Sequence, residues 1–213
     1  MNDNYSIEIS DLTKVFGSRI IFNKINFKRD TPGLAGIAGP NGSGKSTLVK
    51  VIAGLLTQSS GTIKHYLGGK EVHQNSVYSV VGFASPYVYL YDEFSALENL
   101  EISMKIRGLK PDQENFKALL DRFTLWPRRN DPVKAYSSGM KQRLKLIFSV
   151  IHSPGLIIWD EPTANLDSDG KHRVYELASE LAKERIVVFA TNEETEIGMC
   201  SEVINILDYK NNK

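Results

Sequence analysis

The sequence predicts an α/β fold built on a mainly parallel β-sheet, and three observations carry the prediction. A short apolar run near residue 35 leads into a glycine-rich loop and then into apolar residues at helical spacing. A helical pattern fills residues 95–150. Three further apolar runs of strand length follow residue 155, and a helical pattern separates the first two. Strands that alternate with helices are typical of a parallel sheet covered on both faces.

The N-terminal elements are expected to form an antiparallel β subdomain. Ile7 to Leu12 and Ile20 to Phe27 have strand composition and are joined by a turn around Gly17, and Gly61 to His65 predicts another strand. Leu34 to Ala38 predicts a buried strand of the parallel sheet. The apolar run from Tyr78 to Phe83 predicts one more strand before the helical pattern begins.

Three sets of apolar residues in the helical stretch each share one helical face: Leu97, Leu100 and Met104; Phe116, Leu119, Leu120 and Phe123; Leu144, Ile147, Phe148 and Ile151. The final strands are predicted at Leu156 to Trp159, Ile186 to Phe189 and Val203 to Leu207, with a helix around Val174 and Leu177. We expect one domain over residues 1–213, in which a core of residues 1–85 and 151–213 holds an inserted helical subdomain of residues 86–150.

The composition excludes several classes of protein. The 26 basic and 25 acidic residues leave a net charge of +1, which gives no electrostatic footprint for nucleic acid. Cys200 is the only cysteine, which excludes an internal disulfide and a cysteine-based zinc site. The first residues do not resemble a signal peptide, and no apolar run approaches the roughly 18 residues that span a bilayer. We therefore expect a cytoplasmic protein.

The segment from Gly39 to Thr47, GPNGSGKST, matches the phosphate-binding pattern G-x-x-x-x-G-K-[ST]. Glycines let the backbone wrap around an anion with its N–H groups pointing inward, and a helix starting near Lys45 adds the positive end of its dipole. Lys45 can reach the β- and γ-phosphates, and the Ser46 hydroxyl can hold Mg²⁺. Strand, loop and helix together predict a P-loop NTPase with a RecA-like sheet. The expected phosphate-binding residues are Gly39, Asn41, Gly42, Ser43, Gly44, Lys45, Ser46 and Thr47.

Two acidic residues, Asp160 and Glu161, come directly after the predicted strand that begins at Leu156. In α/β sheets, ligands bind beyond the carboxyl ends of the strands. Asp160 is then placed to support Mg²⁺ opposite Ser46, and Glu161 to orient or deprotonate an attacking water. The alternative is a solvated acidic pair at a strand end, against which the upstream phosphate loop argues.

Two further segments resemble the ATP-binding subunits of ABC transporters. Tyr136 to Arg143, YSSGMKQR, resembles the signature motif of that family, and Ala164 to Asp167 resembles its D-loop. Phe16 sits where the family has an aromatic side chain that stacks on adenine. The resemblance covers nearly the whole chain, and its motifs follow the order of the family.

The resemblance implies a head-to-tail dimer with two ATP molecules between its subunits, formed with a second copy or a related subunit. The phosphate loop of one subunit would face the signature motif of the other, where Ser137, Ser138 and Gly139 bind the γ-phosphate. Asp167 is expected to take part in communication between the two sites. The cycle would drive transport through a separate membrane-spanning subunit, which holds this chain at the inner face of the cell membrane. Ser137 can alternatively serve only as the cap of the helix that begins near Gly139.

The chain departs from the family pattern at two positions. Pro86 stands where the family has glutamine, and Asn192 stands where it has histidine. Proline offers no side chain to Mg²⁺ or water, with Ser85 a candidate partial substitute. Asparagine can hydrogen-bond a γ-phosphate oxygen but cannot become a cation near neutral pH. Because Glu161 is kept, we expect an ATPase that turns over slowly or only when coupled to its partner, with Asn192 in the place of the histidine.

The resemblance leaves the transported substrate and two other classes of function open. Phe94 to Leu100 is similar to the matching stretch of haem-exporter-type and multidrug-type subunits, which suggests export. A soluble ABC ATPase outside transport is the first alternative, although such proteins usually carry tandem cassettes, long insertions or basic extensions. An ATP-binding regulatory subunit with little hydrolysis is the second, favoured by Pro86 and Asn192 and opposed by Glu161.

Overall fold

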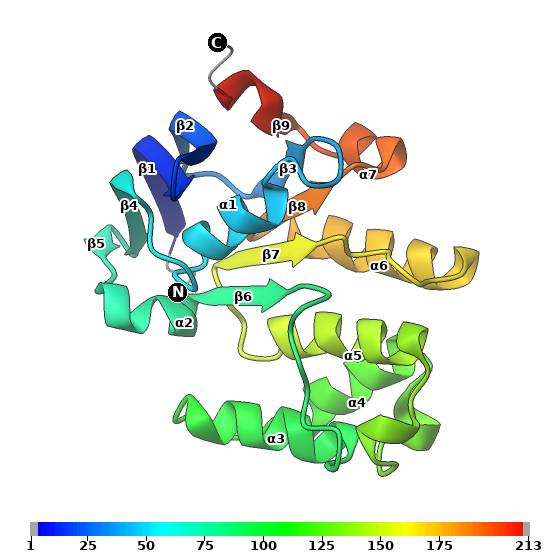
Figure 1. The fold of residues 1–213 in the computed structure, drawn as a ribbon. Helices are drawn as coiled ribbons and strands as arrows, with labels where there is room; N and C mark the ends of the chain where they lie inside the picture. The colour runs from blue at the N-terminus through cyan, green and yellow to red at the C-terminus, as the bar shows by residue number, and fades with distance from the viewer. Residues whose placement is uncertain (1–3, 211–213) are drawn as a thin grey trace.

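The computed structural model describes residues 4–210, which form two β-sheets with helices on either side of the larger one (Figure 1). The expected antiparallel sheet is confirmed, with the order β2-β1-β4-β5. Its strands are β1 (Tyr5–Phe16), β2 (Arg19–Arg29), β4 (Ser60–Leu67) and β5 (Lys70–Glu71). Alternate side chains along β1, such as Ile7 and Ile9, are buried, so one face of this sheet packs against the rest of the protein.

The second sheet is entirely parallel and has the order β6-β7-β8-β3-β9. Its strands are β3 (Gly33–Ala38), β6 (Val81–Ala84), β7 (Leu156–Asp160), β8 (Ile186–Thr191) and β9 (Glu202–Asn205). Because neighbouring strands run the same way, the loops that follow β3, β6, β7 and β8 leave the same edge of the sheet. The phosphate loop, Ser85, Glu161 and Asn192 are on these four loops.

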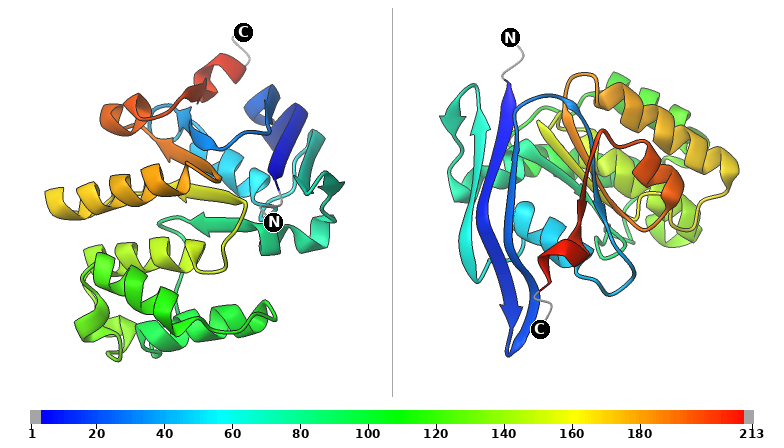
Figure 2. Two further views of the ribbon diagram at one scale, coloured as in Figure 1. Left: turned by 180° about the vertical axis from the view of Figure 1, so that it is seen from behind. Right: turned by 90° about the horizontal axis from the view of Figure 1, so that it is seen from above.

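Helices cover both faces of the parallel sheet. Figure 2 shows α1 (Lys45–Ile52) between the two sheets, and α6 (Ser168–Leu181) on the opposite side with the remaining long helices. The side chains of β7 alternate accordingly: Leu156 and Ile158 belong to the core around α1, and Ile157 and Trp159 to the core on the other side. This near-continuous apolar strand is what burial on both faces requires.

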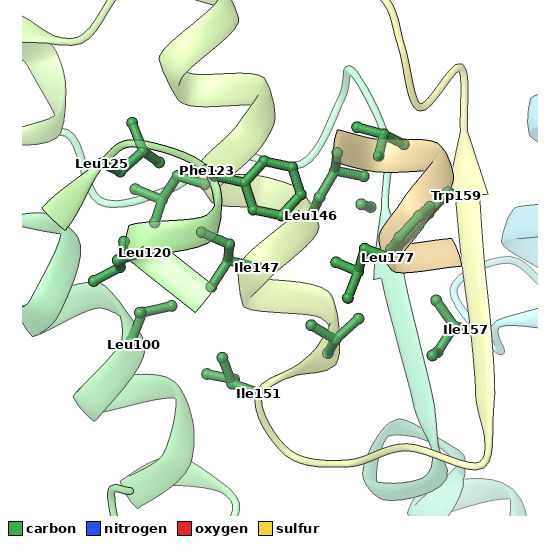
Figure 3. Packing of buried hydrophobic residues seen from close by; sticks show 14 of the residues in the cluster. Leu100, Leu120, Phe123, Leu125, Leu146, Ile147, Ile151, Ile157, Trp159 and Leu177 are labelled. Carbon is green, nitrogen blue, oxygen red and sulfur yellow. The ribbon is translucent and has the colours of Figure 1, made fainter. Parts of the chain in front are cut away.

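The helical stretch after β6 contains α3 (Ala96–Ile106), α4 (Gln113–Arg122) and α5 (Ser138–Val150), with 3₁₀ turns at Trp126–Arg128 and Val133–Ala135. Ser95 and Glu98 form a capping box at the start of α3, while Asp112 and Ser137 cap α4 and α5. Figure 3 shows buried side chains of this stretch packing toward Trp159 of β7 and Leu177 of α6. The helical stretch and the parallel sheet therefore share one hydrophobic core.

Two expected strands are wrong in their extent. The expected strand from Tyr78 to Phe83 is divided: its first half belongs to the short helix α2 (Val77–Val80), which follows a 3₁₀ turn at Gln74–Ser76. Its second half belongs to β6 (Val81–Ala84). The expected strand from Val203 to Leu207 is also shorter in the structure. After the short helix α7 (Glu194–Gly198), strand β9 ends at Asn205, and residues Ile206–Tyr209 form a 3₁₀ turn. A short apolar run does not distinguish a buried helical turn from a buried strand, so the pattern misassigned both.

His152, which follows α5, is buried in a way that makes stability depend on pH. Its Nε2 lies 3.2 Å from the carbonyl oxygen of Val81, whereas its buried Nδ1 has no hydrogen-bond partner among residues 4–210. Burial, followed by the nearby charge of Arg107, lowers the pKa of His152 to about 4. The unfolded chain, with the ordinary pKa of 6.5, binds more protons between these two values. Stability therefore decreases as the pH falls through this range.

We expect His152→Gln to lose less stability than the wild type when the pH falls from about 7 to about 5, because its amide can donate to Val81 O without titrating. Urea unfolding at both pH values measures this. Exposed His172 provides the control, since His172→Gln should follow the wild type. Buried His65, whose pKa is also lowered to about 4 by burial, should leave part of the pH dependence in every variant. An equal loss in His152→Gln and wild type would contradict the prediction.

Candidate active site

The loop between β3 and α1 has the backbone that its glycines predict. Gly42 and Gly44 have φ values of 74° and 111°, and a Cβ atom on Gly44 would lie 2.5 Å from Ile21 Cγ2. Helix α1 begins at Lys45, as predicted, so its first N–H groups point into the loop. The Lys45 ammonium donates to the carbonyl oxygens of Gly39 at 2.8 Å and Pro40 at 3.3 Å. The loop is thus a preformed anion cradle with a lysine held inside it.

A cavity of about 510 Å³ opens over this loop. It is lined by residues 41–47, Arg19, Ile20 and Ile21 of the antiparallel sheet, Tyr87, Glu161 and Lys210. All of the predicted phosphate-binding residues except Gly39 therefore line one cavity, together with the predicted base. Gly39 lies just before it and accepts the hydrogen bond from Lys45.

Asp160 ends the strand β7, and Glu161 follows it directly. Asp160 is only 1% exposed, and its Oδ2 accepts a hydrogen bond of 3.3 Å from Ser85 Oγ. Glu161 has a φ of 52°, and its N–H donates to Ala190 O at 2.9 Å. The Gln142 side chain donates to the carbonyl oxygens of Glu161 at 3.2 Å and Pro162 at 3.1 Å. These contacts hold the backbone of the acidic pair from both β8 and α5.

Burial and mutual charge set the electrostatics of the site. Burial raises the pKa of Asp160 above its ordinary value, and Glu161 acts in the same direction, while the hydroxyls of Ser46 and Ser85 and the charge of Lys45 oppose it. Burial lowers the pKa of Lys45, against the charges of Glu161 and Asp160. A partly desolvated lysine and two carboxylates interact strongly with one another and with any charged ligand.

Two buried oxygen atoms in this region have no hydrogen-bond partner among the described residues: Asp160 Oδ1 and Ser43 Oγ. Buried polar atoms are nearly always satisfied by protein, water or an ion. Carboxylate and hydroxyl oxygens are also the donors that a hard cation such as Mg²⁺ prefers. The Ser46 hydroxyl lies beside Asp160, so the oxygens of these two side chains are a donor set that fits such an ion.

A second cavity of about 330 Å³ is lined by Asn41, Glu161, residues 163–166, Lys171, residues 191–193 and Glu196. It brings the predicted Asn192 to the same space as Glu161. Glu196 is buried beneath it and accepts a hydrogen bond of 2.5 Å from Thr163 Oγ1. Sequence reasoning did not identify Glu196. Its position a few residues after the strand that ends at Thr191 was the one signal that could have pointed to it.

The signature residues lie apart from the phosphate loop within this chain. Ser137 and Ser138 are exposed at the start of α5, and Ser137 Oγ accepts a hydrogen bond of 3.3 Å from Met140 N. Neither cavity is lined by any of residues 137–139. A Cβ atom on Gly139 would lie 2.9 Å from Asn165 O, so the signature loop abuts the D-loop segment.

Two other predicted site residues also lie outside the first cavity. Asp167 caps α6 by accepting a hydrogen bond of 2.8 Å from Gly170 N. Phe16 ends β1, is 49% exposed and has Lys14 Nζ 4.6 Å from its ring centre. An exposed ring beside a cation is available for stacking on a flat ligand.

A family model described as ABC transporter matches residues 22–164. The lantibiotic transport ATP-binding protein SrtF of Streptococcus pyogenes is 31% identical over 203 residues, which cover 95% of this chain and 84% of SrtF. The Nod factor export ATP-binding protein I of Sinorhizobium fredii is 32% identical over 190 residues, which cover 88% of this chain and 55% of that protein. A solved structure of the ATP binding subunit of an ABC transporter superposes with a TM-score of 0.83 at 25% identity, covering 94% of this chain and 85% of that one.

The fold and the site thus define a P-loop ATPase. The chain belongs to the ABC transporter family, in which it is an ATP-binding subunit, and the family relationship confirms the expected nucleotide binding and ATPase activity. None of the helices in residues 4–210 is long and apolar enough to cross a membrane.

Proposed function

We propose that this chain binds and hydrolyses ATP at the interface of a head-to-tail dimer and thereby drives export through a separate membrane-spanning subunit. One observation carries the dimer: Ser137 to Gly139 lie outside both cavities that the phosphate loop and Glu161 line. A second subunit, either a copy or a related chain, supplies them to the open side of the first cavity. Its Asp167 lies on the α6 cap, beside the same interface.

The names of the relatives support the direction of transport. One is an ATP-binding protein of Nod factor export, and the other serves lantibiotic transport. We infer a cytoplasmic location, peripheral on the inner face of the membrane through the partner subunit. The narrower expectation of a haem-exporter or multidrug type stays a prediction.

The roles of the residues follow from their positions. The N–H groups of residues 42–47 and the Lys45 ammonium bind the β- and γ-phosphates, and Phe16 stacks on adenine. Ser46 and Asp160 hold Mg²⁺, which neutralises phosphate charge when bound. Glu161, in the first cavity with its backbone fixed by Gln142, orients and deprotonates the attacking water.

The division of the chain supports this cycle. We propose that residues 86–150 act as an inserted helical subdomain that carries the signature motif, while residues 1–85 and 151–213 form the ATP-binding core. Binding of ATP between two subunits then shifts the population from open to closed dimers, and hydrolysis reverses the shift.

Asn192 is the residue whose replacement tests the departure from the family pattern. It shares the second cavity with Glu161 and can hydrogen-bond a γ-phosphate oxygen. A hydrogen bond to a charged group contributes about 1.5–3 kcal/mol. We therefore expect Asn192→Ala to lower the steady-state rate of phosphate release about 10- to 100-fold from an already slow wild-type rate.

The exposed Asn130 provides the control, because Asn130→Ala should leave the rate unchanged. Rapid wild-type hydrolysis that Asn192→Ala does not alter would contradict the role of Asn192. Complete inactivity of the wild type, even with its membrane subunit present, would instead favour an ATP-binding regulatory subunit. Pro86 and Asn192 favour this second function, because they replace the glutamine and histidine of the family.

A further inference from the structure

The loop that leaves β6 contacts the metal-binding carboxylate through a serine. Ser85 is completely buried, and its Oγ donates to Asp160 Oδ2 at 3.3 Å. The same oxygen accepts a hydrogen bond of 3.3 Å from the N–H of Tyr87. These two bonds fix the Ser85 hydroxyl with its hydrogen toward Asp160 Oδ2, and the other carboxylate oxygen, Oδ1, has no hydrogen-bond partner among residues 4–210.

The same loop is held by a lysine of the helix that carries the signature motif. Lys145 Nζ donates to the carbonyl oxygens of Pro86 at 2.9 Å and Ser85 at 3.4 Å. Lys145 lies in the middle of α5, whose N-terminus is capped by Ser137. Because a helix of this length moves as a rigid element, a displacement of the signature residues displaces the Lys145 backbone as well.

The third attachment is to the nucleotide side of the protein. Tyr87 lines the first cavity, and Lys50 Nζ of α1 lies 4.5 Å from the centre of its ring. The short segment Ser85–Pro86–Tyr87 is therefore joined to α1, to α5 and to Asp160. Pro86 itself contributes only its carbonyl oxygen to this arrangement.

We propose that Ser85 and Lys145 are positioning residues of the ATP site: Ser85 orients the Asp160 carboxylate for Mg²⁺, and Lys145 couples that orientation to the position of α5. The proposal rests on the metal-binding role of Asp160 given above. The Ser85 hydroxyl and the Lys145 ammonium would then connect the signature helix to the metal site. Pro86, which stands where the family has glutamine, has no polar side chain to make this connection.

The test measures nucleotide binding rather than turnover. The full chain is titrated with an ATP analogue that has an imide bridge between its β- and γ-phosphates, by calorimetry, in EDTA and over a series of free Mg²⁺ concentrations. Ser85→Ala should raise the Mg²⁺ concentration for half-maximal enhancement of binding about three- to tenfold, the worth of one hydrogen bond. Its affinity for the analogue in EDTA should match the wild type.

Lys145→Met should shift the Mg²⁺ dependence in the same direction, and the double variant should be no worse than Ser85→Ala alone. Two matched controls should bind like the wild type. Lys105→Met removes a lysine of α3 that pairs with Glu101 at the surface, and Ser103→Ala removes a buried hydroxyl that contacts Arg107.

Four outcomes would overturn the proposal. Loss of analogue affinity in EDTA to the same extent as in Mg²⁺ would show that Ser85 and Lys145 are merely structural. Effects of Ser85→Ala and Lys145→Met that multiply in the double variant would show that Lys145 does not act through Ser85. An unchanged Mg²⁺ dependence in Ser85→Ala, beside a clear shift in Asp160→Asn, would refute the relay and leave the proposed function standing. No shift in Asp160→Asn would refute the metal role of Asp160 itself.

Discussion

Replacing Glu161 with glutamine is expected to lower kcat for ATP about 10²- to 10⁴-fold, which is the range that a positioned general base contributes. The amide keeps the shape and the hydrogen-bonding reach of the carboxylate but cannot accept the proton from the attacking water. The Ala190 and Gln142 contacts are to the backbone of residue 161, so the exchange leaves them intact. The variant should therefore still bind ATP, and the unhydrolysed ATP should hold two subunits together.

Single-turnover phosphate release gives the first part of this result, and size-exclusion chromatography with Mg²⁺ and ATP gives the second, as a doubled mass. Exposed Glu194 on α7 supplies the control, because Glu194→Gln should hydrolyse ATP at the wild-type rate and elute at the same position as the wild type. A glutamine variant that hydrolyses ATP within a few-fold of the wild-type rate would remove Glu161 from the mechanism. One that binds ATP and never dimerises would count against the head-to-tail assembly.

Replacing Trp159 with alanine is expected to lower the free energy of unfolding by about 3–5 kcal/mol, the usual cost of removing a large aromatic side chain from a core. Trp159 is the largest fully buried side chain and stacks on Phe189 with 5.7 Å between ring centres. Its Nε1 donates to Ser149 Oγ at 2.8 Å, which ties β7 to α5. The hydroxyl of Ser149 keeps its bond to Leu146 O, so the loss is mainly one of packing.

Urea unfolding followed by circular dichroism measures this loss as a lower urea concentration at the midpoint of unfolding, with an unchanged m value. Trp126, the other tryptophan, is partly exposed between Lys117 and Arg129 and provides the control. Trp126→Ala should cost much less. A loss below about 1 kcal/mol in Trp159→Ala would mean that the core closes over the missing ring.

The parts of the fold that the sequence predicted are those in which local chemistry decides the structure. The strand before the phosphate loop, the helix that starts at Lys45 and the cap at Ser137 follow from short segments. The order of the strands in the parallel sheet does not, because it depends on which buried faces fit together. The helix at Val77–Val80 was missed because its four residues are too few to show a helical period.

The candidate site divides in the same way. The cavity that joins residues 41–47 to Glu161 was predictable, since each contributor stands at the end of a parallel strand. The contacts from Lys145 to Pro86 and from Thr163 to Glu196 join residues 59 and 33 positions apart. No local pattern marks a lysine in the middle of an amphipathic helix as the partner of a distant carbonyl group, so only the three-dimensional arrangement reveals it.

The left-handed backbone of Glu161, with its φ of 52°, has a consequence for how this protein is expected to change over evolutionary time. Glutamate is an unfavourable residue in that conformation, which glycine and asparagine adopt more readily. Selection for stability alone would thus favour exchanging Glu161 for one of them, and only selection for activity opposes the exchange. A descendant that no longer needs to split ATP would lose glutamate here early. The glycines of its phosphate loop would outlast the activity, because a Cβ atom on Gly39 or Gly44 would clash with a packed isoleucine side chain.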